Sequence, residues 1–98
     1  MKKRTAIAMK VQDNVATAVE SLATGTKVIF NVGDQEMYLT VMQDIPFGHK
    51  FAIRNIIKGE EIIKYGSPIG AAERNIEAGE HVHVHNIGGI RGRGDLPH

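Results

Sequence analysis

Four copies of one short pattern, an aliphatic residue followed by two variable residues and a glycine, recur in this sequence. They occupy residues 22–25, 45–48, 56–59 and 76–79. Each precedes a run rich in β-forming residues, at 27–32, 50–53, 61–65 and 82–85. Because glycine readily adopts positive φ in tight turns, each copy predicts a turn that leads into a short strand. The unequal spacing of the copies is atypical of a solenoid and predicts a small, curled β-structure.

The remaining segments predict two more strands and a helix. Alternating apolar residues indicate strands within residues 1–10 and 36–42, and residues 66–70 indicate a turn or bulge. Asp13 precedes apolar residues at helical spacing, so we expect it to cap a helix that ends near Gly25. The helical stripe consists of Val15, Ala18, Val19 and Leu22. The predicted fold class is therefore mainly β with one or two short helices, an α+β domain.

Length restricts the chain to one small domain. Its 98 residues, 42% of them hydrophobic, are typical of a globular protein. We assign residues 1–90 to the domain and the glycine-rich residues 91–98 to a flexible C-terminal tail. So short a chain has difficulty enclosing a deep pocket, which favours a subunit or binding module over a self-contained enzyme.

Charge and composition exclude several classes of protein. A net charge of +1 argues against binding to nucleic acid or to a membrane surface. Apolar runs are too short to span a bilayer, so we expect a cytoplasmic protein. The sequence contains no cysteine, which excludes disulfides, thiol catalysis and iron–sulfur ligation by this chain.

Three histidines alternate at the end of the last predicted strand: His81, His83 and His85. Alternate residues of a strand project from one face, so these imidazoles would lie on the same side. Two such imidazoles can bind one zinc, iron, copper or nickel ion, and a catalytic metal needs a third protein ligand from elsewhere. A solvent-exposed strand face and direct acid–base or substrate contact are the competing interpretations.

Two basic segments are further candidates. Lys50 beside His49 could hold a carboxylate next to an acid–base imidazole, although the same residues also suit an ordinary surface turn. Arg91 and Arg93 alternate with glycines, and guanidinium groups bind carboxylates or phosphates bidentately. An RNA-binding tail and a tail without a role are the alternatives for this second segment.

The order of several motifs resembles a known family. Gly-His-Lys stands at 48–50, Tyr-Gly at 65–66, Pro-Ile-Gly at 68–70 and His-Val-His-Asn at 83–86. Together they resemble the small N-terminal domain of the altronate and galactarate dehydratases, which has the antifreeze-like SAF fold, a β-clip. The small subunit of (R)-sulfolactate sulfo-lyase is similar as well. The resemblance extends over about residues 10–95.

The resemblance implies a lyase that removes water, or sulfite, from a hydroxy acid. It also implies a divalent metal, Fe²⁺ in the first place and Mn²⁺ as the alternative, shared with or held by a large subunit. The implied catalytic residues are His49, His83 and His85, of which His83 and His85 would bind the metal. The implied substrate-binding residues are Lys50, Asn86, Arg91 and Arg93. Position 81 often carries an aromatic residue in the family, so His81 is not among the implied ligands.

The resemblance also implies partners. The chain looks like the free-standing small subunit of a two-chain enzyme, inactive without its large catalytic subunit. Because a subunit keeps an apolar face for its partner, we expect the isolated chain to self-associate weakly through that face. A sugar acid such as altronate is the favoured substrate. Sulfolactate, with sulfite leaving, is one alternative. A stand-alone SAF module that binds a carbohydrate or an anion is the alternative from another class.

Overall fold

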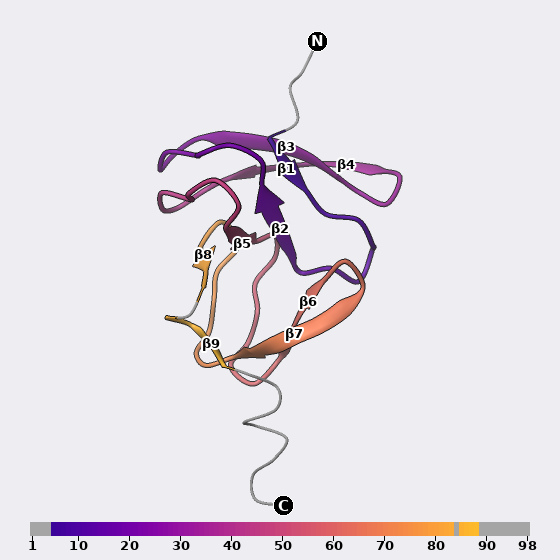
Figure 1. Ribbon diagram of the computed structural model, residues 1–98, viewed down its shortest axis with the longest axis vertical. Coiled ribbons are helices and arrows are strands. Elements are labelled where there is room, and N and C mark those ends of the chain that lie inside the picture. The colour runs from indigo at the N-terminus through magenta and orange to yellow at the C-terminus, as the bar shows by residue number, and fades with distance from the viewer. Residues whose placement is uncertain (1–4, 84, 89–98) are drawn as a thin grey trace, which may run out of the picture.

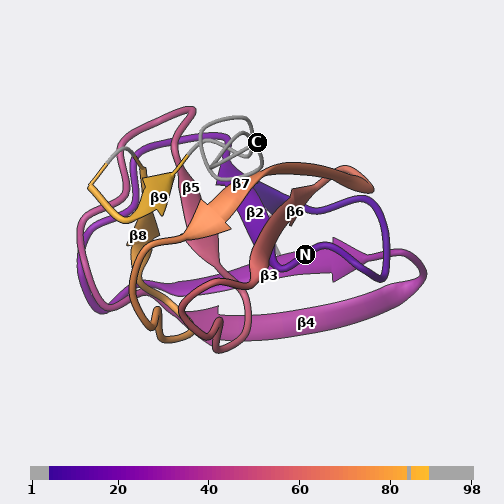
Figure 2. The same ribbon diagram turned by 90° about the horizontal axis from the view of Figure 1, so that it is seen from below.

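The computed structural model describes residues 5–83 and 85–88, which form nine β-strands (Figure 1). Their bounds are β1 Ala6–Ile7, β2 Val15–Ala18, β3 Lys27–Val32, β4 Gln35–Thr40, β5 Lys50–Ala52, β6 Glu61–Lys64, β7 Ser67–Ala72, β8 His81–Val82 and β9 Ile87–Gly88. One sheet has the order β1-β2-β5-β8, β3 and β4 form a hairpin, and a third sheet has the order β6-β7-β9. The hairpin and the third sheet lie on opposite sides of β2 and β5 (Figure 1), and Figure 2 shows the two long strands β3 and β4 side by side.

The repeated pattern forms four similar corners, numbered 1 to 4 in chain order, as the sequence predicts. Their glycines all have positive φ: +88° at Gly25, +84° at Gly48, +92° at Gly59 and +93° at Gly79. In each corner the residue after the glycine donates its N–H to the carbonyl three residues earlier, over 2.9–3.0 Å. Glycine in this position is what a type II turn requires, so the prediction of the turns is confirmed.

The corners pair in the order in which they occur. Leu22 and Ile45 exchange two backbone hydrogen bonds of 2.8 Å, and Ile56 and Ile76 do the same. The β3–β4 hairpin separates the first pair and β6–β7 separates the second. Apart from β1 and β9, the described chain therefore consists of two similar halves, from β2 to β5 and from β5 to β8, with β5 common to both.

Each half has its own hydrophobic core. The first contains Phe30 and Phe51, whose rings meet edge to face with centroids 6.1 Å apart. The second is built mainly from aliphatic side chains: Val15, Ala52, Ile56, Ile62, Ala72, Ile76 and Val82. Strands β2 and β5 contribute to both cores, since Ala16 belongs to the first and its neighbour Val15 to the second.

The predicted helix at residues 13–25 is wrong, and the described residues contain no helix of any kind. The segment forms strand β2, which lies between β1 and β5 with both faces covered. A strand buried on both faces loses the alternation of polar and apolar residues, and its apolar positions then imitate helical spacing.

Asp13 has a different role from the predicted helix cap. It is 1% exposed, and its carboxylate accepts the N–H groups of Met9, Lys10 and Gly66 over 2.7–3.1 Å. Burial raises the pKa of this carboxyl, but the backbone hydrogen bonds outweigh burial and leave the pKa below its usual value. Asp13 thereby joins the N-terminal segment to the β6–β7 turn.

The other strand predictions agree with the structure except at two places. The strand predicted at 82–85 ends at Val82. The segment predicted as a turn at 66–70 is mostly strand β7, with the irregular register between Ile62 and Ile63 on its partner β6. The predicted tail, residues 91–98, lies outside the described residues. In the part of the chain that the structure describes, no helix is long and apolar enough to cross a membrane.

Candidate functional site

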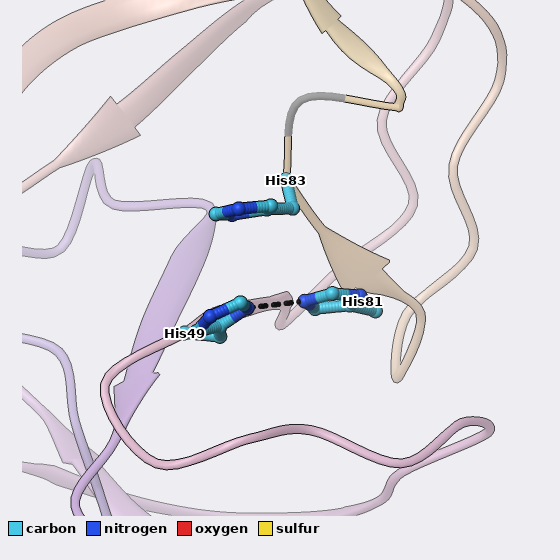
Figure 3. Close-up of side chains that lie close together, drawn as sticks. All are labelled: His49, His81 and His83. Atoms are coloured by element: carbon cyan, nitrogen blue, oxygen red, sulfur yellow. Dashed lines mark hydrogen bonds between the residues drawn. The ribbon is translucent and has the colours of Figure 1, made fainter.

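His49, His81 and His83 converge in space and form what we call the histidine cluster (Figure 3). His49 precedes β5, and His81 lies on β8, which pairs with β5 so that Phe51 faces His81. The Nδ1 atom of His49 lies 2.8 Å from Nε2 of His81, a hydrogen-bonding distance. One nitrogen from each of the three rings lies within 4.8 Å of the others. Strand pairing thus joins residues from two distant segments in one cluster.

The rings of the histidine cluster are nearly parallel. The centroids of His49 and His83 are 4.2 Å apart, and the rings of His81 and His83 differ in plane by 9°. The ring of His85 lies 5.2 Å from that of His81 but outside the convergent set. The chain turns after His83, whose carbonyl accepts the N–H groups of Asn86 and Ile87. The three imidazoles are close together as predicted, but the strand expected to present them ends at Val82, and the turn after His83 places His85.

The local sequence explains why the side chain at position 49 is not bonded to the backbone of its own turn. After the glycines of corners 3 and 4 stand Glu60 and Glu80, whose carboxylates accept the N–H groups of Ile57 and Glu77 over 2.6–2.7 Å. The corresponding donor position in corner 2 is Pro46, and proline has no N–H. His49 therefore has no turn amide to satisfy, and its ring contacts His81 instead.

Asn86 holds the backbone that carries the other two histidines. The residue is fully buried. Its Oδ1 accepts the N–H of His83 over 3.0 Å, and its Nδ2 donates to the carbonyl of His81 over 2.8 Å. Because both polar atoms of the side chain are bonded to the backbone, we assign Asn86 a positioning role in place of the substrate contact implied by the resemblance.

The environment of His81 and His83 favours the neutral form of both imidazoles. Burial, followed by the neighbouring histidines and Lys50, lowers the pKa of His81 from 6.5 to about 4. Desolvation and the charges of His49, Lys50 and His85 also lower the pKa of His83. Burial and then Lys64 lower the pKa of Lys50. Neutral imidazoles have a free nitrogen lone pair, which both a proton acceptor and a metal ligand need.

The lowered pKa of His81 predicts a pH-dependent stability. Between pH 6.5 and about 4 the unfolded chain binds a proton at this residue and the folded chain does not. We expect the free energy of unfolding to fall as the pH is lowered through that range, and the His81→Phe variant to show a shallower fall. Urea denaturation at a series of pH values, with a chelator present, measures this. An equal slope in His81→Phe would contradict the prediction.

The donor set suits particular metals. Three imidazoles match the preference of iron, zinc, copper and nickel, whereas manganese prefers oxygen ligands. The residues therefore fit Fe²⁺ better than Mn²⁺. An ion would take the place of the proton between His49 and His81, and at least one ring would have to rotate, because imidazole lone pairs lie in the ring plane.

The remaining predicted residues are placed as follows. Lys50 is partly buried at the start of β5, directly after His49. Arg91 and Arg93 lie outside the described residues. His81 is the residue that sequence reasoning set aside. The pairing of the strands that follow corners 2 and 4 is the signal that could have placed it beside His49.

Comparison with known proteins agrees with this β-structure. Residues 4–89 match the altronate/galactarate dehydratase SAF domain. The chain belongs to this family. It is 53% identical to an altronate dehydratase of Escherichia coli (strain K12) over 74 residues, which are 76% of the chain and 14% of that protein. An altronate dehydratase of Bacillus subtilis (strain 168) is 41% identical over 76 residues, again 14% of its length.

A second kind of relative is closer in size. The (2R)-sulfolactate sulfo-lyase subunit alpha of Chromohalobacter salexigens is 44% identical over 71 residues, which are 70% of this chain and 76% of that subunit. The family resemblance deduced from the motifs is thus confirmed. The chain spans only a small part of the altronate dehydratases that it matches but most of the sulfo-lyase subunit.

Proposed function

We propose that this chain is the small subunit of a two-chain lyase that eliminates water from a sugar acid such as altronate. The observation that carries the proposal is the 53% identity to an altronate dehydratase over 76% of this chain. The name "subunit alpha" of the sulfo-lyase relatives supports a division of the enzyme between chains. The large catalytic subunit would supply the rest of the active site.

The histidine cluster offers groups that such an elimination needs. Removing water next to a carboxylate requires a base for the α-proton, and a neutral imidazole can accept one at neutral pH. His83 is partly exposed with a lowered pKa, and His49 forms a hydrogen bond with a second imidazole. Lys50, next to His49, can attract the substrate carboxylate. A bound divalent metal would supply Lewis-acid stabilisation of the leaving hydroxide.

The surface around corner 2 supports a partner. Phe47, two residues before His49, is 69% exposed. Large apolar side chains on the surface beside a functional cluster are typical of an interface. We propose that the large subunit covers the corner with Phe47 and closes the site over the histidine cluster.

Co-expression of the chain with a large subunit of the altronate dehydratase family tests the proposal. We expect a stable complex that dehydrates altronate. His49→Ala in the complex should lower kcat by about 10²–10⁴-fold, the usual contribution of a general acid or base. Lys58→Ala, at the exposed tip of corner 3, is the matched control and should retain activity. Absence of a complex, or an active His49→Ala complex, would contradict the proposal.

Sulfolactate is the second candidate substrate, with sulfite as the leaving group. The 44% identity to a sulfo-lyase subunit alpha, over 76% of that subunit, favours it. Parallel assays of sulfite release and of dehydration, on the same purified complex, distinguish the two substrates. Release of sulfite without dehydration of altronate would select this second candidate.

A further inference from the structure

The residues of the histidine cluster meet within a single chain. We propose that this chain by itself binds one divalent transition-metal ion through His49, His81 and His83, with at least one coordination position left open. The inference deepens the proposed function and rests on it only for the use of the metal in catalysis. The binding itself is a property of the chain and can be tested without a partner.

The number and type of donors support the site. Three protein ligands with an open position are the pattern of catalytic zinc-type sites, whereas closed structural sites use four. The nitrogens of the cluster lie within 4.8 Å of one another, and two of them are already 2.8 Å apart. A tetrahedral ion with metal–nitrogen bonds of about 2.0–2.1 Å would hold its ligand nitrogens about 3.3–3.4 Å apart. The nitrogens of His49 and His81 would therefore move slightly apart, and any pair farther apart than this separation would move slightly closer.

The backbone that carries the ligands is already held in place. The His81 N–H donates to Oε1 of Gln43 over 2.8 Å, and Asn86 binds the His81 carbonyl and the His83 N–H. On the opposite segment, the His49 N–H donates to the carbonyl of Pro46 over 3.0 Å. Binding an ion thus requires rotation of imidazole rings and little rearrangement of the chain, which lowers the entropic cost of binding.

The geometry selects a different pair of C-terminal ligands from the one the motif implies. His83 and His85 are the pair expected from the family motif, but His85 is exposed and lies outside the convergent nitrogens. His81 is partly buried and directly bonded to His49. The assignment of His81 as a ligand, in place of His85, is therefore the part of the proposal that an experiment can decide.

Titration of the isolated 98-residue chain with Co²⁺ tests the site, because cobalt reports tetrahedral coordination through its visible absorption. We expect one ion per chain with a tetrahedral-type spectrum. Removing a residue that only hydrogen-bonds to a metal ligand typically weakens metal binding by roughly 10–100-fold. His81→Phe and His49→Ala each remove a ligand itself, so each should weaken binding by more than that. His85→Gln should bind as tightly as the unmodified chain.

A second measurement uses no substitution, so it tests the site even if a variant fails to fold. In the unmodified chain labelled with ¹⁵N, addition of Zn²⁺ should shift the imidazole nitrogen resonances of His49, His81 and His83 and leave those of His85 in place. Binding that is lost in His85→Gln but retained in His81→Phe would overturn the proposal. So would weak binding of several ions without a tetrahedral spectrum.

These outcomes separate the inference from the proposed function. A chain that binds one ion through the cluster, but forms no active lyase with a large subunit, would support the site and contradict the function. An active complex whose small subunit binds no ion would do the reverse.

Discussion

Asn86→Ala should lower the free energy of unfolding by roughly 2–6 kcal/mol, since it removes the partner of two partly buried backbone groups, at about 1–3 kcal/mol each. These groups are the His83 N–H and the His81 carbonyl, which the Asn86 side chain binds at 3.0 and 2.8 Å. Because a small domain is stabilised by only about 5–15 kcal/mol, this loss is a large share of the total. Urea denaturation, monitored by circular dichroism, measures it.

The control for this substitution is Asn75→Ala. The Oδ1 of Asn75 accepts the N–H of Lys58 over 2.8 Å, but both residues are exposed, so water can replace the lost bond. We expect a loss of about 1 kcal/mol or less at this position. Equal losses in the two variants would show that Asn86 does not clamp the backbone of the histidine cluster. A stable Asn86→Ala variant that still binds Co²⁺ normally would show the same.

Gly79→Ala should destabilise the chain more than the same substitution in corner 3. Gly79 has φ of +93°, and an added Cβ would lie 2.6 Å from the Thr40 carbonyl oxygen and 3.2 Å from Cγ of Met42. Positive φ costs a residue with a side chain about 1–3 kcal/mol, and overpacking adds about 1–3 kcal/mol. A decrease in the melting temperature, converted to a free energy, measures the sum of the two costs.

Gly59→Ala supplies the matched control. Gly59 has φ of +92°, and an added Cβ there meets nothing within 4 Å. This variant therefore carries the conformational cost alone, and the difference between the two variants isolates the clash with β4. If both variants lose the same stability, the close approach of corner 4 to Thr40 does not contribute to the fold.

The corners could be predicted from the sequence because their cause is local. A glycine at positive φ and a hydrogen bond across three residues lie within each copy of the pattern, as at Gly25 and Gly48. The pairing of corners is not local, since Leu22 meets Ile45 and Ile56 meets Ile76. For that reason the sequence predicted repeated turns but not the two halves that the turns create.

The wrong prediction of a helix and the unforeseen position of His81 beside His49 have the same physical origin. Ala16 and Val15 are buried on opposite faces of β2 by different cores, and a sequence pattern cannot show which neighbours cover a strand. His81 likewise gains its role from β5, which pairs with β8 across a long sequence separation. His49 and His83 became candidates because they stand in short motifs, whereas the position of His81 beside them depends on strand pairing.

The sequence separation between His49 and His81, 32 residues, has a thermodynamic consequence. An ion held by both would fasten the ends of a loop that contains the whole β6–β7 hairpin, and only the folded chain presents its ligands together. A ligand that binds only the folded state, at a concentration a hundredfold above its Kd, raises the free energy of unfolding by about 2.7 kcal/mol. The melting temperature of this chain would then rise with the concentration of free metal ion in its surroundings.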